Sequence, residues 1–423
     1  MQLFAYVKNR SWPTLFGYAF FIGMMATGYY YNLTYVQLGL FDLGTRVIGL
    51  SEAEVARDVG IFALITCAAA LAFGTLMQRS GWSANFHVKL RLAFFVALTQ
   101  SVLTAIGPFL RSEPLLLGWI ILASLALGLG VPVTFGLTVD LIPARDRGYV
   151  AATITALAYF VAAVFSSVWI IERFAIQVMG PMLAGTVVVG VLAFGRFDFI
   201  ERLASQHRLP EFHTGRLLAR EAPSTRYIGR RILIAALLMF GIFFIDSLGF
   251  LRLIFTPVYV NSAWHSGQAG TLLFIGVTHV VAAFIGGILY SALDVRTMFQ
   301  WVFGLFALVQ LMYTFHARLT PGSTAVLAMP MLYATAVSMY TVLNFAMWAD
   351  ISTPRTISRN VAIGVATSGW TATFLSTALA IRWRLDGLPL AEHLNRVAAL
   401  AMLFFLLAFV IWTAQNWAER VKA

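Results

Sequence analysis

The feature that most constrains this chain is a series of long apolar stretches that recurs along its whole length. A helix that crosses a bilayer needs about 20 consecutive apolar residues, and 423 residues leave room for twelve such helices with their connections. Only 11% of the residues are charged, far below the roughly 25% of a typical soluble protein. The sequence therefore predicts an all-α integral membrane protein. Spans are expected at residues 13–41, 51–78, 87–110, 114–142, 147–170, 176–196, 231–258, 267–293, 297–317, 322–350, 358–382 and 391–414.

The basic residues are distributed unevenly between the two sides of the predicted helices. If both termini face the cytoplasm, 20 of the 29 Lys and Arg residues lie on the inner side and 8 on the outer side, and the net charge of +11 falls on the inner side. This bias follows the positive-inside rule. It predicts a multi-pass protein of the cell (inner) membrane with both termini in the cytoplasm. Because the basic residues are scattered and lack an aromatic platform, nucleic-acid binding is not expected.

The chain divides into two similar halves around one polar segment. Residues 197–230 are rich in Arg, His and Pro, and indicate a cytoplasmic linker between an N-terminal six-helix bundle (1–196) and a C-terminal one (231–423). An acid, a proline and two arginines follow both the fourth and the tenth predicted helix. They are Asp140, Pro143, Arg145 and Arg147 in the first half, and Asp350, Pro354, Arg355 and Arg359 in the second. Two six-helix halves with repeated features are a transporter architecture.

These features resemble the major facilitator superfamily (MFS) of secondary transporters over essentially the full length of the chain. The loop after the second predicted helix is similar to the family's signature there, with Gln78 in place of the usual acid. Its matching residues are Gly74, Arg79, Gly81, Lys89 and Arg91. The resemblance implies two pseudo-symmetric bundles that expose a central cavity alternately to each side. The first, fourth, seventh and tenth helices would line that cavity, and substrate would bind near the membrane midplane.

Two features of typical drug–proton antiporters of that family are missing. The fourth predicted helix contains no arginine, and residues 149–169 contain neither glycine nor proline. The sequence therefore assigns no subfamily. The repeated loop charges are expected to help close the inner gate when the cavity faces outward. The gate residues are Asp140, Arg145, Arg147, Asp350, Arg355 and Arg359.

Ionisable residues inside the predicted spans are costly unless they are paired or hydrated, and they therefore indicate functional positions. Asp246 lies near the middle of the span 231–258, and His279 lies near the middle of the span 267–293. Two titratable groups at one depth on neighbouring helices predict a proton-coupling site. The alternative is a static polar contact that holds the two helices together.

Other polar and aromatic residues in the spans are candidates for substrate binding. Arg252 follows Asp246 in the same span, and could bind an anionic group, pair with another acid or reach the outer headgroups. Tyr31, Asn32 and Tyr35 follow one stripe of the first span, where a membrane-interface aromatic belt is the alternative. The tenth and eleventh spans contribute the remaining candidates, for which helix packing is the alternative. They are Thr341, Asn344, Trp348 and Trp370.

Several function classes are excluded by missing motifs. The only lysines are Lys8, Lys89 and Lys422, each preceded by valine, so no Walker A loop is present and no ATP hydrolysis is expected. No motif of a soluble enzyme or of a cofactor site occurs, and the methionines indicate packing rather than a metal site. A capping box at Ser51 and Glu54 marks the start of the second helix.

The sequence thus predicts a secondary active transporter, neither an enzyme nor a cofactor-binding protein. Its partners would be protons, membrane lipids and a small organic solute of amphipathic or aromatic character, and it would act as a monomer. A non-transporting member of the same fold, an assembly factor or a lipid or pigment chaperone, is the alternative. The substrate and the direction of transport do not follow from these residues.

Overall fold

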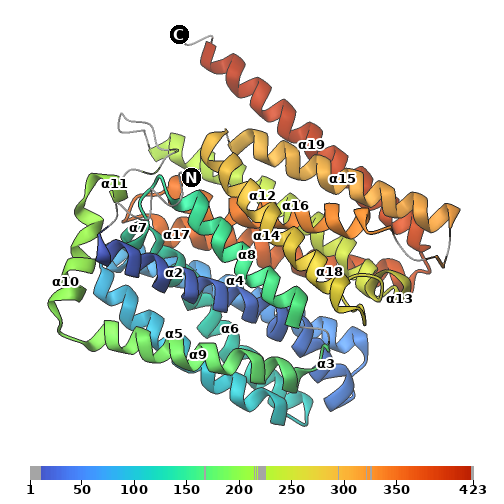
Figure 1. Cartoon of the computed structure of the whole chain (residues 1–423), viewed down its shortest axis with the longest axis horizontal. Coiled ribbons are helices and arrows are strands. Elements are labelled where there is room, and N and C mark those ends of the chain that lie inside the picture. Colours follow the sequence, from blue (N-terminus) through green and yellow to red (C-terminus); the bar gives the residue numbers. More distant parts are fainter. Residues whose placement is uncertain are drawn as a thin grey trace.

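The computed structural model describes residues 11–165, 168–213, 215, 217, 225–293, 295–320, 322–323 and 326–420. In these ranges the chain forms helices joined by short connections, with no strand (Figure 1). In the described part of the chain, twelve long helical segments cross the molecule. Those of the N-terminal bundle are α2 (Trp12–Tyr31) with its continuation, α4 (Glu52–Arg79), α5 (Phe86–Ile106), α6 (Glu113–Gly136), α8 (Arg147–Phe165) and α9 (Ile171–Phe194). Those of the C-terminal bundle are α12 (Thr225–Ile254), α14 (Ala269–Ala292), α15 (Val295–Leu319), α16 (Ala328–Asp350), the run from α17 (Ile357–Val361) to α18 (Ala372–Leu385), and α19 (Leu390–Arg420).

Nine of the described helices are long and apolar enough to cross a membrane by length and composition: α4, α5, α6, α8, α9, α12, α14, α15 and α19. The other three segments are the first, α16 and the eleventh. The first and eleventh segments are interrupted by π-helical turns, and α16 carries more polar residues. The predicted all-α membrane architecture of two six-helix bundles is confirmed. The exact bundle boundaries at residues 196 and 231 stay a prediction.

The first helix is longer than the expected span 13–41. After α2 it continues without a break through η1 (Asn32–Gly39), α3 (Leu40–Asp42) and η2 (Leu43–Ile48), of which η1 and η2 are π-helical. It ends at Gly49, whose φ of 85° is left-handed and costs glycine little because it has no Cβ. The eleventh segment has a π-helical stretch of its own, η6 (Ala362–Thr371). Such wide turns frequently mark functional sites.

The start of α4 confirms the predicted capping box. The Ser51 side chain accepts a hydrogen bond from the Glu54 backbone N–H, and the Glu54 carboxylate accepts one from the Ser51 backbone N–H at 2.8 Å. Two of the free N–H groups of the helix end are thereby satisfied.

Glycines lie at two close contacts between the bundles. A Cβ on Gly148 of α8 would lie 2.6 Å from the Ser291 Oγ and 3.0 Å from the Gly287 carbonyl oxygen of α14. A Cβ on Gly74 of α4 would lie 2.8 Å from the Ser358 carbonyl oxygen of α17. Small residues let helix backbones approach each other inside a membrane. These positions therefore allow the bundles to approach each other closely at the end of the molecule where α8 and α17 begin.

The connection between the bundles lies at that same end. Of its short helices, α10 (Asp198–Ser205) contacts α2, and α11 (Pro210–His213) contacts α7 (Thr138–Leu141) (Figure 1). The Ala144 backbone N–H donates to the Glu211 carbonyl at 2.9 Å, and the Leu217 N–H donates to the Asp350 carbonyl at 3.1 Å. We call this the linker end. Residues 214, 216 and 218–224 of the predicted linker lie outside the described residues.

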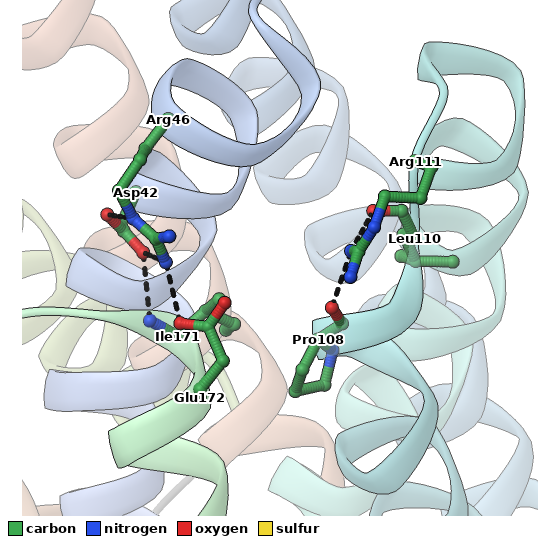
Figure 2. A network of polar contacts seen from close by, with 7 residues as sticks. All are labelled: Asp42, Arg46, Pro108, Leu110, Arg111, Ile171 and Glu172. Atoms are coloured by element: carbon green, nitrogen blue, oxygen red, sulfur yellow. Dashed lines mark hydrogen bonds and ion pairs between the residues drawn. The ribbon is translucent and has the colours of Figure 1, made fainter.

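At the opposite end, charged side chains join the first helix to the sixth. Figure 2 shows the Arg46 guanidinium between the Asp42 carboxylate, at 2.7 Å, and the Glu172 carboxylate, at 2.6 Å. The Asp42 carboxylate also accepts the Ile171 backbone N–H at 2.9 Å, at the first residue of α9. Nearby, Arg111 donates to the Pro108 carbonyl at 2.7 Å. The contacts of Asp42, Arg46 and Glu172 thus join the first helix to α9 at the end away from the linker.

Candidate functional site

A cavity of about 650 Å³ lies between the two bundles. Residues of α2, η1 and α8 line it from one bundle, and residues of α12, α14, α16 and η6 line it from the other. Its surface is mostly aliphatic and aromatic, with a few polar groups, which is typical of a small-molecule site. Among the described residues that line it, Asp246 is the one acid, and none is a lysine or an arginine.

Asp246 faces this cavity from α12 and is held by two tyrosines of α16. The Tyr340 hydroxyl donates to its Oδ2 at 2.5 Å, and the Tyr333 hydroxyl donates to its Oδ1 and, at 3.0 Å, to its backbone carbonyl. Tyr333 and Tyr340 are seven residues apart and therefore lie on one face of their helix. The carboxylate remains partly exposed to the cavity. An acid in a membrane interior is thus paired with hydroxyl donors rather than with a cation.

His279 lies on α14 and joins a polar network that crosses both bundles. Its Nδ1 lies 2.8 Å from the Ser338 Oγ of α16, and its ring stacks on Tyr159 of α8 at 4.5 Å between ring centroids. The Tyr159 hydroxyl lies 2.8 Å from the Tyr29 hydroxyl of α2, and each lies 3.4 Å from the Thr341 hydroxyl. Asp246 and His279 therefore have different partners, and α16 supplies a partner to both.

Four of the expected substrate residues line the cavity: Tyr31, Asn32, Asn344 and Trp370. The Asn32 Oδ1 is buried and has no hydrogen-bond partner within the described part of the chain. The Tyr31 hydroxyl donates to the Gln100 Oε1 at 3.0 Å, so its polar end is already satisfied within the N-terminal bundle. Trp370 packs against Phe62 of the other bundle at 5.5 Å between ring centroids.

The other four expected substrate residues do not line the cavity. Tyr35 is fully buried and donates to the Thr104 carbonyl at 3.2 Å. Arg252 donates to the Leu388 carbonyl at 3.2 Å, near the end of α12. Thr341 lies behind the Tyr29 and Tyr159 hydroxyls, and the Trp348 indole donates to the Asn344 Oδ1 at 2.9 Å. These residues support the walls of the cavity rather than line it.

Sequence reasoning missed the tyrosine partners Tyr333 and Tyr159 and the rings of Phe243, Phe250 and Trp264, all of which line the cavity. The seven-residue spacing of Tyr333 and Tyr340 was the one available signal. Aromatic residues are common in membrane helices, and which of them meet a given carboxylate depends on how each helix is rotated about its axis.

Two of the six expected gate residues, Arg147 and Asp350, are paired with each other across the bundles. The Arg147 Nη1 lies 2.7 Å from the Asp350 Oδ1, with both side chains at most 1% exposed. The Tyr290 hydroxyl donates to the Asp350 Oδ2 at 2.6 Å. Asp140 instead forms an ion pair with Lys89 inside the N-terminal bundle.

The remaining gate candidates take other positions at the linker end. Arg145 and Arg355 are exposed to solvent. Arg359 is partly buried, and its Nε has no hydrogen-bond partner among the described residues. The structure therefore brings Arg147 and Asp350 together across the bundles.

No protein-family model and no curated protein matches the sequence. Solved structures do match. The proton:xylose symporter XylE, a major facilitator superfamily protein bound to 6-bromo-6-deoxy-D-glucose, aligns with a TM-score of 0.64 at 13% identity over 93% of this chain and 95% of that chain. The human organic anion transporter MFSD10 (TETRAN) aligns with a TM-score of 0.66 at 13% identity over 94% of this chain and 100% of that chain. At such identity the likeness concerns the fold alone, and the chain has the fold of the major facilitator superfamily.

Proposed function

We propose that the protein is a secondary active transporter that moves a small organic solute through the central cavity by alternating access, with proton coupling at Asp246. The observation that carries the proposal is a partly exposed carboxylate in a cavity that both bundles enclose. Ionisable groups inside a membrane protein are rare and mark substrate or proton pathways. The linker end would face the cytoplasm, as the excess of basic residues on that side indicates.

Contacts between the bundles at both ends of the cavity support alternating access. At the linker end, Arg147 pairs with Asp350. At the opposite end, Glu52 of α4 forms an ion pair with Arg384 of α18, and the Trp169 ring stacks on His265 at 5.0 Å. In a rocking mechanism, the contacts at one end of the cavity break while those at the other end remain formed.

Protonation of Asp246 would link this movement to a proton gradient. A bare carboxylate that is sealed away from water is costly, whereas a neutral carboxyl is tolerated. The protonated protein would therefore close around the cavity more readily, and release of the proton would favour an open state. His279 of α14, whose ring contacts Ser338 of α16, is the proposed relay for that proton.

Asp246→Asn tests the coupling. A solute for this assay would come from a thermal-shift screen of the purified protein, because a bound ligand raises the melting temperature. In proteoliposomes at saturating solute and with a pH gradient, the variant is expected to accumulate no more solute inside than it does without the gradient. The reason is that Asn cannot exchange a proton. Asp198→Asn, at an exposed position of α10, is the matched control and should accumulate solute normally.

Normal pH-driven accumulation by Asp246→Asn would show that Asp246 is a structural partner of α16 and not the coupling site. Binding of a lipid or pigment without any pH-driven movement would favour the non-transporting alternative.

A further inference from the structure

The charge of the cavity limits which solutes it can hold. Asp246 is the one formal charge among the described lining residues, and it is negative. Arg252, the cation that could have received an anionic solute, is absent from the lining and donates to the Leu388 carbonyl. A cavity with a single negative charge attracts cations and repels anions.

Aromatic rings surround this carboxylate on the cavity side. Phe243 precedes Asp246 by three residues and Phe250 follows it by four, so both lie on its face of α12. The Phe243 ring lies 5.2 Å from that of Tyr340, and the Phe250 ring lies 5.2 Å from that of Trp264.

The Tyr333 ring completes the group. It lies 5.8 Å from the rings of both Phe250 and Trp264. All five rings line the cavity. We call Phe243, Phe250, Trp264, Tyr333 and Tyr340 the aromatic box. Aromatic faces around a carboxylate are the arrangement that recognises organic ammonium groups, through cation–π attraction.

We infer that the transported solute is a small organic ammonium cation with an apolar or aromatic body, whose charged nitrogen binds between Asp246 and the aromatic box. This inference rests on the proposed transport function and names its substrate class. Since a proton and the ammonium group would compete for one carboxylate, transport is an exchange of one for the other. A monovalent cation would then leave as one proton enters, with no net movement of charge.

No other acid lines the cavity among the described residues. The titratable groups that line it beside Asp246 are Tyr29, Tyr31, Tyr159, Tyr333, Tyr340 and His279. The acid at the start of the neighbouring helix α19, Glu392, is half-exposed and paired with Arg396. The carboxylate of Asp246 is therefore the group for which the proton and the solute compete.

Binding of benzyltrimethylammonium tests the inference, because this quaternary cation does not itself titrate. Calorimetry on the purified protein at pH 8 should show binding that weakens as the pH falls. Benzyl alcohol, neutral and similar in shape, should bind more weakly and without pH dependence, and benzoate should not bind. Asp246→Asn should weaken binding of the cation by about 30-fold or more.

Variants of the box separate recognition from folding. Phe243→Leu and Trp264→Leu should each weaken binding of the cation by about 3-fold to 10-fold and leave benzyl alcohol unaffected. Phe244→Leu is the matched control, because its ring stacks on Phe240 and does not line the cavity. Equal binding of the cation and benzyl alcohol, or cation binding that both box variants leave unchanged, would overturn the inference.

The two proposals fail in different ways. Proton-driven movement of a neutral solute without cation binding would overturn the ammonium inference and leave the transport function intact. Cation binding with the expected pH profile, but without proton-driven movement of any solute in proteoliposomes, would overturn the transport function and the exchange.

Discussion

Asp146 is a fully buried carboxyl in the loop between α7 and α8, at the linker end. The Tyr18 hydroxyl of α2 donates to its Oδ2. Burial, and secondly the negative charge of Glu211 on α11, raise the pKa of Asp146 from 3.8 to about 7. Between about pH 4 and pH 7, the folded protein therefore keeps this proton, whereas the unfolded chain has released it.

The stability that this proton contributes has a definite pH dependence. It is fully present below about pH 4, where folded and unfolded chains both carry the proton, and it is lost as the pH rises through 7. Asp146→Asn should remove this component, because the amide is neutral throughout. The measurement is the melting temperature of the purified protein from pH 4 to 8, with Asp198→Asn as control. An identical pH slope in the wild type and Asp146→Asn would contradict the assignment.

At the scale of elements, the ion pair between α8 and α16 joins two helix ends at which the helix dipole opposes the charge present. Arg147 is the first residue of α8, and Asp350 is the last residue of α16. A cation at a helix N-terminus and an anion at a C-terminus both oppose the helix dipole, by about 0.3–1 kcal/mol each. The two charges are compensated by each other across the bundles. Separation of the bundles at this end therefore costs more than the loss of one surface ion pair.

Loss of this pair should open the linker end. Removal of one partner of a buried ion pair costs about 3–5 kcal/mol, so Asp350→Asn should speed labelling of a cavity cysteine by at least about 10-fold. Gly28→Cys in a Cys67→Ala background is a suitable reporter, because Gly28 lines the cavity and a Cβ there meets nothing within 4 Å. An impermeant maleimide would be added to inside-out vesicles, where the proposed topology exposes the linker end.

Two further variants make this test specific. Arg355→Ala changes an exposed arginine of the same region and should leave labelling unchanged. The exchange of Arg147→Asp together with Asp350→Arg should restore slow labelling, because it rebuilds the pair and places each charge where its helix dipole favours it. Fast labelling in the exchanged protein would mean that the pair is not the closing contact.

At the scale of the whole molecule, the orientation in the membrane is the main prediction. A reporter fused after Ala423 should behave as cytoplasmic, because 20 of the 29 Lys and Arg residues lie on the side of the termini and the linker. A reporter inserted at Gly322, between α15 and α16, should behave as external. An external signal at Ala423 would refute either the orientation or the even number of spans.

Features that depend on local pattern could be predicted from the sequence alone. Apolar runs long enough for a bilayer determine the helices and their membrane location, and the Ser51 capping box determines the start of α4. Asp246 could be singled out as a candidate because a carboxylate deep in an apolar run is costly in any arrangement, and the structure places it on the wall of the cavity. The acid, proline and arginines that recur in both halves led to the expectation of a gate, which stays a prediction.

The partners of those residues were decided only by the tertiary structure. Arg147 meets Asp350 across 203 positions of the chain, and Tyr333 meets Asp246 across 87. Tyr35 and Arg252 carry the right chemistry for a cavity but face its supporting walls. In a membrane helix that is apolar on every side, hydrophobicity does not determine how the helix is rotated about its axis. That rotation is set by packing against neighbouring helices, and it decides which side chains reach the cavity.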